Sequence, residues 1–296
     1  MKNLGGIGSN VEEIISNAIG GNRRSLSKLL TIIESGKSIP TNNLGAWTLG
    51  VTGPPGVGKS TLIGKMIIEW ISRGEKVAVL AVDPSSPKSG GALLGDRMRM
   101  AISDANDLVF VRSLATRNHP GGLTSFLAPM ISLLSQCGWT RIIIETVGSG
   151  QSEIRIVAFA DRVLLVEGPD RGDIIQAEKA GIIELADIIA INKSDLPSAQ
   201  LAADSLQNSL SLSTETAIEV CLVSAHLGDG VTELVESIEQ IETDSNRDTI
   251  RFRERLLSAW DSRLISHPQF NEVIRALSAG TITLDEALEQ ISQATN

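Results

Sequence analysis

The chain has 296 residues, of which 42% are hydrophobic and 21% charged, a composition typical of a soluble globular protein with one sizeable core. Its formal net charge of −9 provides no basic surface that would attract a phosphate backbone, so we expect no sequence-independent binding of nucleic acid. Residues 1–10 lack the apolar core of a signal peptide and no apolar run approaches the length of a membrane span, so we expect a cytoplasmic protein with no membrane partner. Cys137 and Cys221 lie too far apart in sequence to form a Cys-x-x-Cys metal or redox site.

The chain begins with apolar residues at helical spacing over 11–35, which predicts a helical N-terminal extension within residues 1–45. From residue 47 to about 241, short β-branched runs alternate with longer helical patterns, as in a mostly parallel sheet covered by helices on both faces. The predicted strands are 47–52, 76–82, 108–112, 141–145, 162–167, 188–192 and 218–223, with crossover helices such as 60–73 and 197–210. The fold class expected over residues 46–243 is therefore a three-layer α/β domain.

The C-terminal part, residues 244–296, has helical patterns over 246–266 and 271–293, with Pro268 and Gly280 as breakers. We predict a helical arm there that packs on the domain or binds a partner.

The first predicted strand leads into a glycine-rich segment that reads Gly53-Pro54-Pro55-Gly56-Val57-Gly58-Lys59-Ser60-Thr61. Glycines let consecutive backbone N–H groups surround a β-phosphate, and the helix that follows adds its positive N-terminus. In such a loop Lys59 reaches the β- and γ-phosphate oxygens and the Ser60 hydroxyl binds Mg²⁺. A plain glycine-rich turn is the alternative, but the flanking strand and helix favour a P-loop NTPase.

A second motif, Asn192-Lys193-Ser194-Asp195, follows an apolar strand at the carboxyl end of the sheet, where α/β folds bind ligands. A carboxylate there accepts hydrogen bonds from guanine N1–H and N2–H₂, which adenine cannot donate. Asp195 could instead be a plain helix N-cap. A later strand ends in Ser224-Ala225-His226, whose backbone N–H groups can meet the guanine carbonyl, and the order of the three motifs favours guanine over adenine.

Acidic residues at other strand ends are candidate Mg²⁺ ligands. Glu145, in Glu145-Thr146-Val147-Gly148, takes the position of a carboxylate that holds Mg²⁺ or its water, and the Gly148 N–H can sense the γ-phosphate. Asp83 and Asp96 are further metal-side candidates, although Asp83 could simply cap a turn and Glu145 could lie on the surface.

The candidates for catalysis are Lys59, Asp96, Glu145 and Gln151, of which Gln151 would orient a water molecule. Arg97, Arg99 and Arg117 are the cations available for transition-state charge, and spacing alone places none of them. The three histidines are scattered, so we expect no histidine metal site.

With these residues the sequence resembles the MeaB/ArgK-type GTPases, which are chaperones of cobalamin-dependent acyl-CoA mutases and were formerly named lysine/arginine/ornithine transport ATPases. Besides the two nucleotide motifs, the resemblance rests on the blocks Val79 to Pro87, Gly90-Gly91, Leu94 to Arg97, Glu145 to Gly148 and Gly150 to Glu153. It implies a homodimer that hydrolyses GTP to GDP with Mg²⁺, the C-terminal arm serving dimerisation or partner binding. It also implies that hydrolysis gates cofactor loading and protects a mutase, adenosylcobalamin belonging to that partner.

Two loops depart from the family pattern. Arg117-Asn118-His119-Pro120 stands where the family has Arg-Gly before Gly-Gly-Leu, and Ala180 replaces one lysine of a loop thought to relay the nucleotide state. These departures leave the identity of the mutase open. Two alternative functions also stay open: an ATP-driven kinase or accessory of an amino-acid transport system, and a metallochaperone GTPase, which the missing Cys-x-x-Cys and histidine clusters disfavour.

Overall fold

A computed structural model describes residues 5–41, 47–83, 107–115, 124–146, 158–169, 182–183, 185–213, 218–242, 245–265 and 267–293. Its strands are β1 (Thr48–Thr52), β2 (Val77–Asp83), β3 (Val109–Ala115), β4 (Arg141–Thr146), β5 (Arg162–Glu167), β6 (Ile188–Asn192) and β7 (Glu219–Val223). They form one seven-stranded sheet in the order β3-β2-β4-β1-β5-β6-β7, in which every pair of neighbours is parallel.

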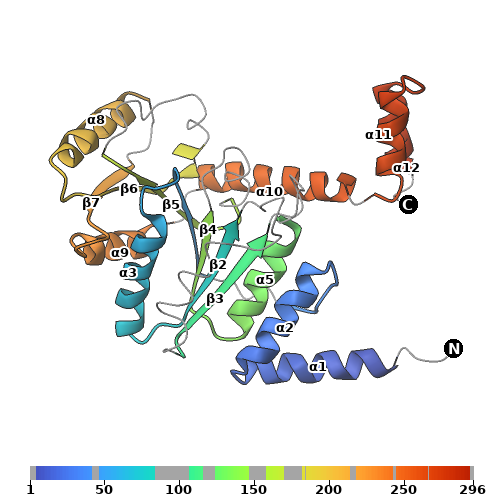
Figure 1. Cartoon of the computed structure of the whole chain (residues 1–296), viewed down its shortest axis with the longest axis horizontal. Helices are drawn as coiled ribbons and strands as arrows, with labels where there is room; N and C mark the ends of the chain where they lie inside the picture. The colour runs from blue at the N-terminus through green and yellow to red at the C-terminus, as the bar shows by residue number, and fades with distance from the viewer. Residues whose placement is uncertain are drawn as a thin grey trace.

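The helices are α1 (Gly5–Ile19), α2 (Arg23–Glu34), α3 (Lys59–Ser72), α5 (Thr124–Gln136), α8 (Ser198–Ser213), α9 (Val231–Gln240), α10 (Ser245–Ile265), α11 (Phe270–Ser278) and α12 (Leu284–Gln293). On one face of the sheet, α3 and α9 share an apolar core with β1 and its neighbours. On the opposite face, α2 and α5 pack on the β2–β4 side and α8 packs on the β6–β7 side (Figure 1). The predicted three-layer α/β architecture is therefore confirmed.

The central strands are buried on both faces, which explains their almost continuous apolar sequence. Each predicted strand is present; β5 and β6 match the predicted bounds, and the ends of the other strands differ from the prediction by at most three residues. The largest shift at the N-terminus is in α1, which begins at Gly5, although the apolar periodicity starts only at residue 11. Glycines lower helix propensity, so sequence alone favoured the later start.

The N-terminal helices form a hairpin on the β3 edge of the domain. Asn22 caps α2, because its side-chain oxygen accepts a hydrogen bond from Ser25 N over 3.0 Å. Arg112 of β3 pairs with Glu34 at the end of α2, and the apolar face of α2 packs against α5. These contacts hold the hairpin against the sheet.

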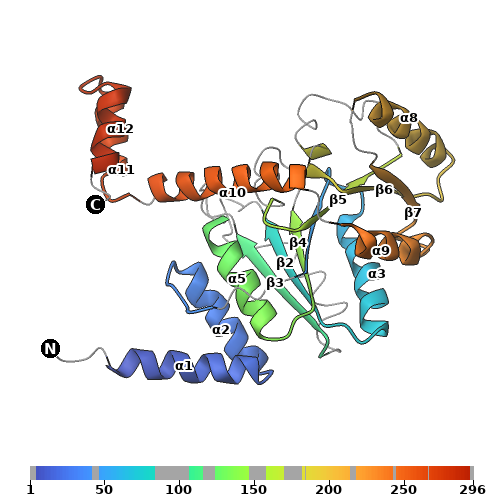
Figure 2. The same ribbon diagram turned by 180° about the vertical axis from the view of Figure 1, so that it is seen from behind.

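The C-terminal helices extend beyond the sheet, with α11 and α12 at the far end of α10 (Figure 2). The near end of α10 is fixed by Arg251, which is 1% exposed, pairs with Asp187 and donates to the Asp161 carbonyl oxygen over 2.7 Å. Arg255 adds a 2.6 Å hydrogen bond to the Ala158 carbonyl oxygen. Arg251 therefore binds the segments that lead into β5 and β6, and Arg255 binds the segment that leads into β5.

Across the described ranges, none of the helices combines the length and the apolar character that crossing a membrane requires.

Candidate functional site

The phosphate loop, residues 53–61, joins the end of β1 to the start of α3 at the carboxyl end of the sheet. Two of its glycines have neighbours that leave no room for a side chain. At Gly53 (φ 140°) a Cβ would lie 2.0 Å from the Val166 carbonyl oxygen, and at Gly58 (φ 95°) it would lie 2.4 Å from Asn192 Nδ2. The loop is thus packed directly against β5 and β6, and these contacts require glycine.

Lys59 begins α3 and directs its side chain back into the loop. Its Nζ donates to the carbonyl oxygens of Gly53 over 2.6 Å and Pro54 over 2.9 Å, and the residue is 7% exposed. The ammonium group is thereby held next to the backbone N–H groups of the loop and the positive end of α3. A cation in this position is suited to bind phosphate oxygens.

Ser60 and Glu145 meet beside Lys59. The Ser60 hydroxyl donates to Glu145 Oε1 over 2.5 Å, and Glu145 is 2% exposed. The pairing of Val51 with Glu145 in neighbouring strands places the carboxylate next to the phosphate loop. A hydroxyl and a carboxylate oxygen are both suitable ligands for Mg²⁺, so this donor set fits that ion.

Asn192, at the end of β6, joins the phosphate loop to the loop after β7. Its Nδ2 donates to the Val57 carbonyl oxygen over 2.7 Å, and its Oδ1 accepts from Ala225 N over 2.9 Å. Both hydrogen bonds are buried. One side chain therefore sets the distance between the phosphate loop and residues 224–230, which we term the base loop.

Asp195 lies beside the base loop, on the surface. Ser224 Oγ donates to Asp195 Oδ1 over 2.6 Å and also accepts from Leu227 N over 3.3 Å. The Ser224 hydrogen bond, followed by a backbone hydrogen bond and the positive potential of His226 and Lys193, holds the pKa of Asp195 below its ordinary value. Asp195 is therefore an ionised acceptor, oriented by Ser224.

Lys193, within the same turn, has a φ of 64°, a left-handed conformation that is uncommon for a residue other than glycine. The chain reverses there immediately after β6, and Ser194 N donates to the Val223 carbonyl oxygen over 3.0 Å. Strain at Lys193 thus accompanies the placement of Asp195 beside the base loop.

The structure brings together most of the predicted site residues: the phosphate loop, Glu145, Asn192 to Asp195, and Ser224 with Ala225. His226 is exposed in the base loop, and Asp83 ends β2, next to β4. Asp96, Gly148 and Gln151 lie outside the described residues, as do Arg97, Arg99 and Arg117. Within the described ranges, no three His, Cys, Asp or Glu side chains gather as a metal site.

Sequence reasoning missed Glu167, which ends β5 and is 1% exposed. It lies at the carboxyl end of the sheet, directly after Val166, whose carbonyl oxygen packs on Gly53. An acidic residue that closes the apolar run 163–166 is the signal that could have identified it. Glu167 is therefore a second buried acidic residue at this edge of the sheet.

Known proteins that are similar to this chain in sequence include several named as GTPases. The family model described as methylmalonyl Co-A mutase-associated GTPase MeaB matches residues 27–277. A putative GTPase of Pyrococcus horikoshii is 41% identical over 246 residues, covering 78% of this chain and 77% of the relative. A probable GTPase of Mycobacterium bovis is 34% identical over 94% of this chain and 93% of its own length. The mouse methylmalonic aciduria type A homolog, a mitochondrial protein, is 38% identical over 66% of this chain and 48% of its own length.

Solved structures share the fold. One described as an LAO/AO transport system kinase has a TM-score of 0.67 and 23% identity, covering 99% of this chain and 98% of that chain. HypB from Helicobacter pylori in complex with nickel has a TM-score of 0.50 and 14% identity, covering 73% of this chain and 94% of that chain. At these identities the likeness concerns the fold alone.

Proposed function

The chain belongs to the family of methylmalonyl-CoA mutase-associated GTPases, and from this premise we propose that it is a Mg²⁺-dependent G-protein chaperone of a cobalamin-dependent acyl-CoA mutase. As a member of this family it is a GTPase that binds guanine nucleotide. The contact that most supports a site of this kind is Asn192, because it joins the phosphate loop to the base loop through two buried hydrogen bonds.

We propose that the phosphate side of the site works through Lys59, Ser60 and Glu145. Phosphate oxygens would replace the carbonyl oxygens that Lys59 now contacts, and Ser60 and Glu145 would hold Mg²⁺, directly or through its water. When bound, Mg²⁺ would neutralise the negative charge that develops on the phosphate oxygens during hydrolysis. Catalytic roles for Asp96 and Gln151, a metal role for Asp83 and γ-phosphate sensing by Gly148 stay predictions.

The base side would be read by Asp195 and the base loop. The ionised Asp195 carboxylate accepts from guanine N1–H and N2–H₂, whereas adenine would leave it without those donors. Ser224 orients this carboxylate, and Lys193, Ala225 and His226 line the same side of the site. The proposal therefore assigns base selection to Asp195 and orientation to Ser224.

Homodimerisation through the C-terminal arm is part of the proposal. Phe252, Leu256 and Trp260 follow one another at four-residue spacing on α10 and are 62%, 71% and 61% exposed. Large apolar side chains at this spacing share one face of a helix, and an exposed apolar face of this kind supports an interface. We also propose a division of the chain into an N-terminal extension over 1–45, a GTPase domain over 46–243 and an arm over 244–296. The cytoplasmic location stays a prediction.

The mutase partnership is supported by the name of the matching family and by the name of the mouse relative. Adenosylcobalamin would belong to the mutase. The nickel in the HypB structure belongs to that protein, and the described residues of this chain contain no His, Cys, Asp and Glu cluster that supports a metallochaperone. An ATP-driven kinase or transport accessory is the remaining alternative, and nucleotide preference separates it from the proposal.

The test is the rate of GTP hydrolysis by the purified protein with Mg²⁺, measured with and without a cobalamin-dependent acyl-CoA mutase from the same organism. The proposal predicts a slow intrinsic rate that rises severalfold with the mutase. A mutase from another enzyme class, which lacks cobalamin, serves as the control. An intrinsic rate that does not respond to the cobalamin enzyme would leave the GTPase in place and exclude this client.

A further inference from the structure

Both loops of the proposed site continue into helices that lie side by side. The phosphate loop leads into α3 at Lys59, and the base loop leads into α9 at Val231, after Gly230. The two helices share the core on one face of the sheet through, among others, Met66, Trp70 and Ile238. The relative position of the two loops therefore depends on how α3 packs against α9.

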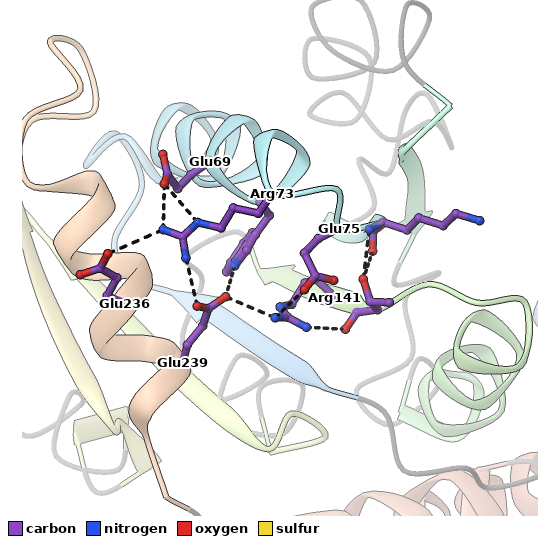
Figure 3. Close-up of polar contacts among 9 residues, drawn as sticks. Glu69, Arg73, Glu75, Arg141, Glu236 and Glu239 are labelled. Atoms are coloured by element: carbon purple, nitrogen blue, oxygen red, sulfur yellow. Dashed lines mark hydrogen bonds and ion pairs between the residues drawn. The ribbon is translucent and has the colours of Figure 1, made fainter.

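Glu239 joins these helices at the ends that lie away from the loops (Figure 3). It stands in the last turn of α9 and accepts three hydrogen bonds: from Trp70 Nε1 over 2.9 Å, from Arg73 Nη1 over 3.1 Å and from Arg141 Nη2 over 3.3 Å. Trp70 lies in the last turn of α3 and Arg73 directly follows that helix, whereas Arg141 begins β4, the strand that carries Glu145 near its other end. One carboxylate thus connects the three elements that carry the phosphate loop, the proposed Mg²⁺ ligand and the base loop.

The surrounding contacts hold the donors in place. Arg73 also pairs with Glu69 over 2.8 Å, and Arg141 pairs with Glu75 over 3.0 Å and stacks on Trp47 at 4.9 Å from the ring centre. Trp70 is fully buried, so its indole N–H depends on Glu239 as its acceptor in this network. The side chains are oriented by contacts on two sides, as a rigid clamp requires.

We propose that Glu239 is a positioning residue for nucleotide binding, which fixes the phosphate loop relative to the base loop through α3 and α9. This inference rests on the proposed function, since it requires one nucleotide to contact both loops. Asn192 joins the two loops at the nucleotide end, and Glu239 joins α3 and α9 at the opposite end, so this pair of helices is held at two points. Loss of the distal contact lets α3 tilt against α9 and misplaces the loops relative to each other.

The proposal distinguishes ligands by how many loops they contact. GDP spans the phosphate loop and the base loop, whereas inorganic tripolyphosphate contacts only the phosphate loop. The Glu239→Gln substitution replaces one carboxylate oxygen with an NH₂ group. This NH₂ group would face the N–H donors of Trp70, Arg73 and Arg141, so hydrogen bonds of this clamp would be lost. We expect the affinity for GDP to fall about tenfold while the affinity for tripolyphosphate changes less than about twofold.

The matched control is Glu233→Gln, which removes the same charge from an exposed position on the same helix, and both affinities should stay at the wild-type values. Calorimetric titration measures both ligands. If Glu239→Gln does not fold, Arg73→Met removes one arm of the same clamp at a half-exposed position and should show the same selective loss.

Equal losses for both ligands, or no loss for either, would overturn the positioning role. Failure of the wild-type protein to bind GDP would instead overturn the proposed function, and with it this inference, so the wild-type titration separates the two failures.

Discussion

Ser60 and Glu145 form a 2.5 Å hydrogen bond across 85 residues of sequence. The contact exists because β1 and β4 are neighbours in the sheet although the chain visits β2 and β3 between them. Parallel strands end at the same edge, so a hydroxyl at the start of α3 and a carboxylate at the end of β4 meet beside the phosphate loop. The pair provides the oxygen ligands that the proposed Mg²⁺ site needs.

Glu145→Gln should remove most of the Mg²⁺-dependent hydrolysis. The carboxamide keeps the shape of the side chain but loses the negative charge, so we expect the hydrolysis rate to fall by about 100-fold or more. GDP binding in the presence of EDTA should stay close to the wild-type value, because the phosphate and base loops are unchanged. An unaltered dependence of the rate on Mg²⁺ concentration would exclude Glu145 from the metal site.

Ser224→Ala should raise the pKa of Asp195. Its pKa lies below the ordinary value chiefly because of the Ser224 hydrogen bond, so the contribution of the carboxylate to guanine binding is present above this pKa and lost as pH falls through it. Without the hydroxyl, the loss should occur at a higher pH. An NMR titration of the Asp195 carboxyl group in both proteins measures the shift, and identical midpoints would contradict the role given to Ser224.

Gly58→Ala should be more destabilising than Gly56→Ala. Both glycines have positive φ angles, 95° and 79°, so either alanine is strained by about 1–2 kcal/mol. Only at Gly58 would the new Cβ meet a neighbour, Asn192 Nδ2 at 2.4 Å, whereas at Gly56 nothing lies within 4 Å. The free energies of unfolding without nucleotide, measured by urea denaturation, should therefore differ. Equal values would show that the phosphate loop and Asn192 are not packed as described.

Arg251→Met should lower the free energy of unfolding by about 3–5 kcal/mol, because it leaves the buried Asp187 carboxylate without its cation. Arg253→Met removes the same charge from an exposed position on the same helix and should change the free energy by less than about 0.5 kcal/mol. Chemical denaturation of both variants provides the comparison. A similar small effect in both would mean that α10 is not anchored through Arg251.

The fold could be predicted from sequence because its signals are local. Apolar β-branched runs such as residues 188–191 marked the buried strands, and the glycine-rich loop before Lys59 marked the strand-to-helix turn. The helices of the arm followed from periodicity together with Gly280 as a breaker. Local patterns of this kind determine elements and motifs, and the alternation of strands with helices indicates that the strands are parallel.

The contacts that connect the motifs could not be predicted in the same way. Nothing near Glu239 in sequence distinguishes it from the exposed Glu233, and its partners lie 98 to 169 residues away. Arg251 resembles a surface arginine until α10 is placed against Asp187. Asn192 was identified as part of a motif, but its two hydrogen bonds depend on the spatial order of β1, β6 and β7. Such roles arise from long-range packing, which leaves no periodic signal.

The most direct test of the account is the nucleotide preference of the wild-type protein and of Asp195→Asn, measured as hydrolysis of GTP, ATP and XTP with Mg²⁺. The wild type should prefer GTP to ATP by at least about 1,000-fold, because adenine leaves the carboxylate without donors. The Asp195→Asn variant should hydrolyse GTP poorly and should gain hydrolysis of XTP. Xanthine has a carbonyl oxygen at C2, and the asparagine amide can donate a hydrogen bond to it. Unchanged GTP selectivity in the variant would contradict the assignment of guanine recognition to Asp195.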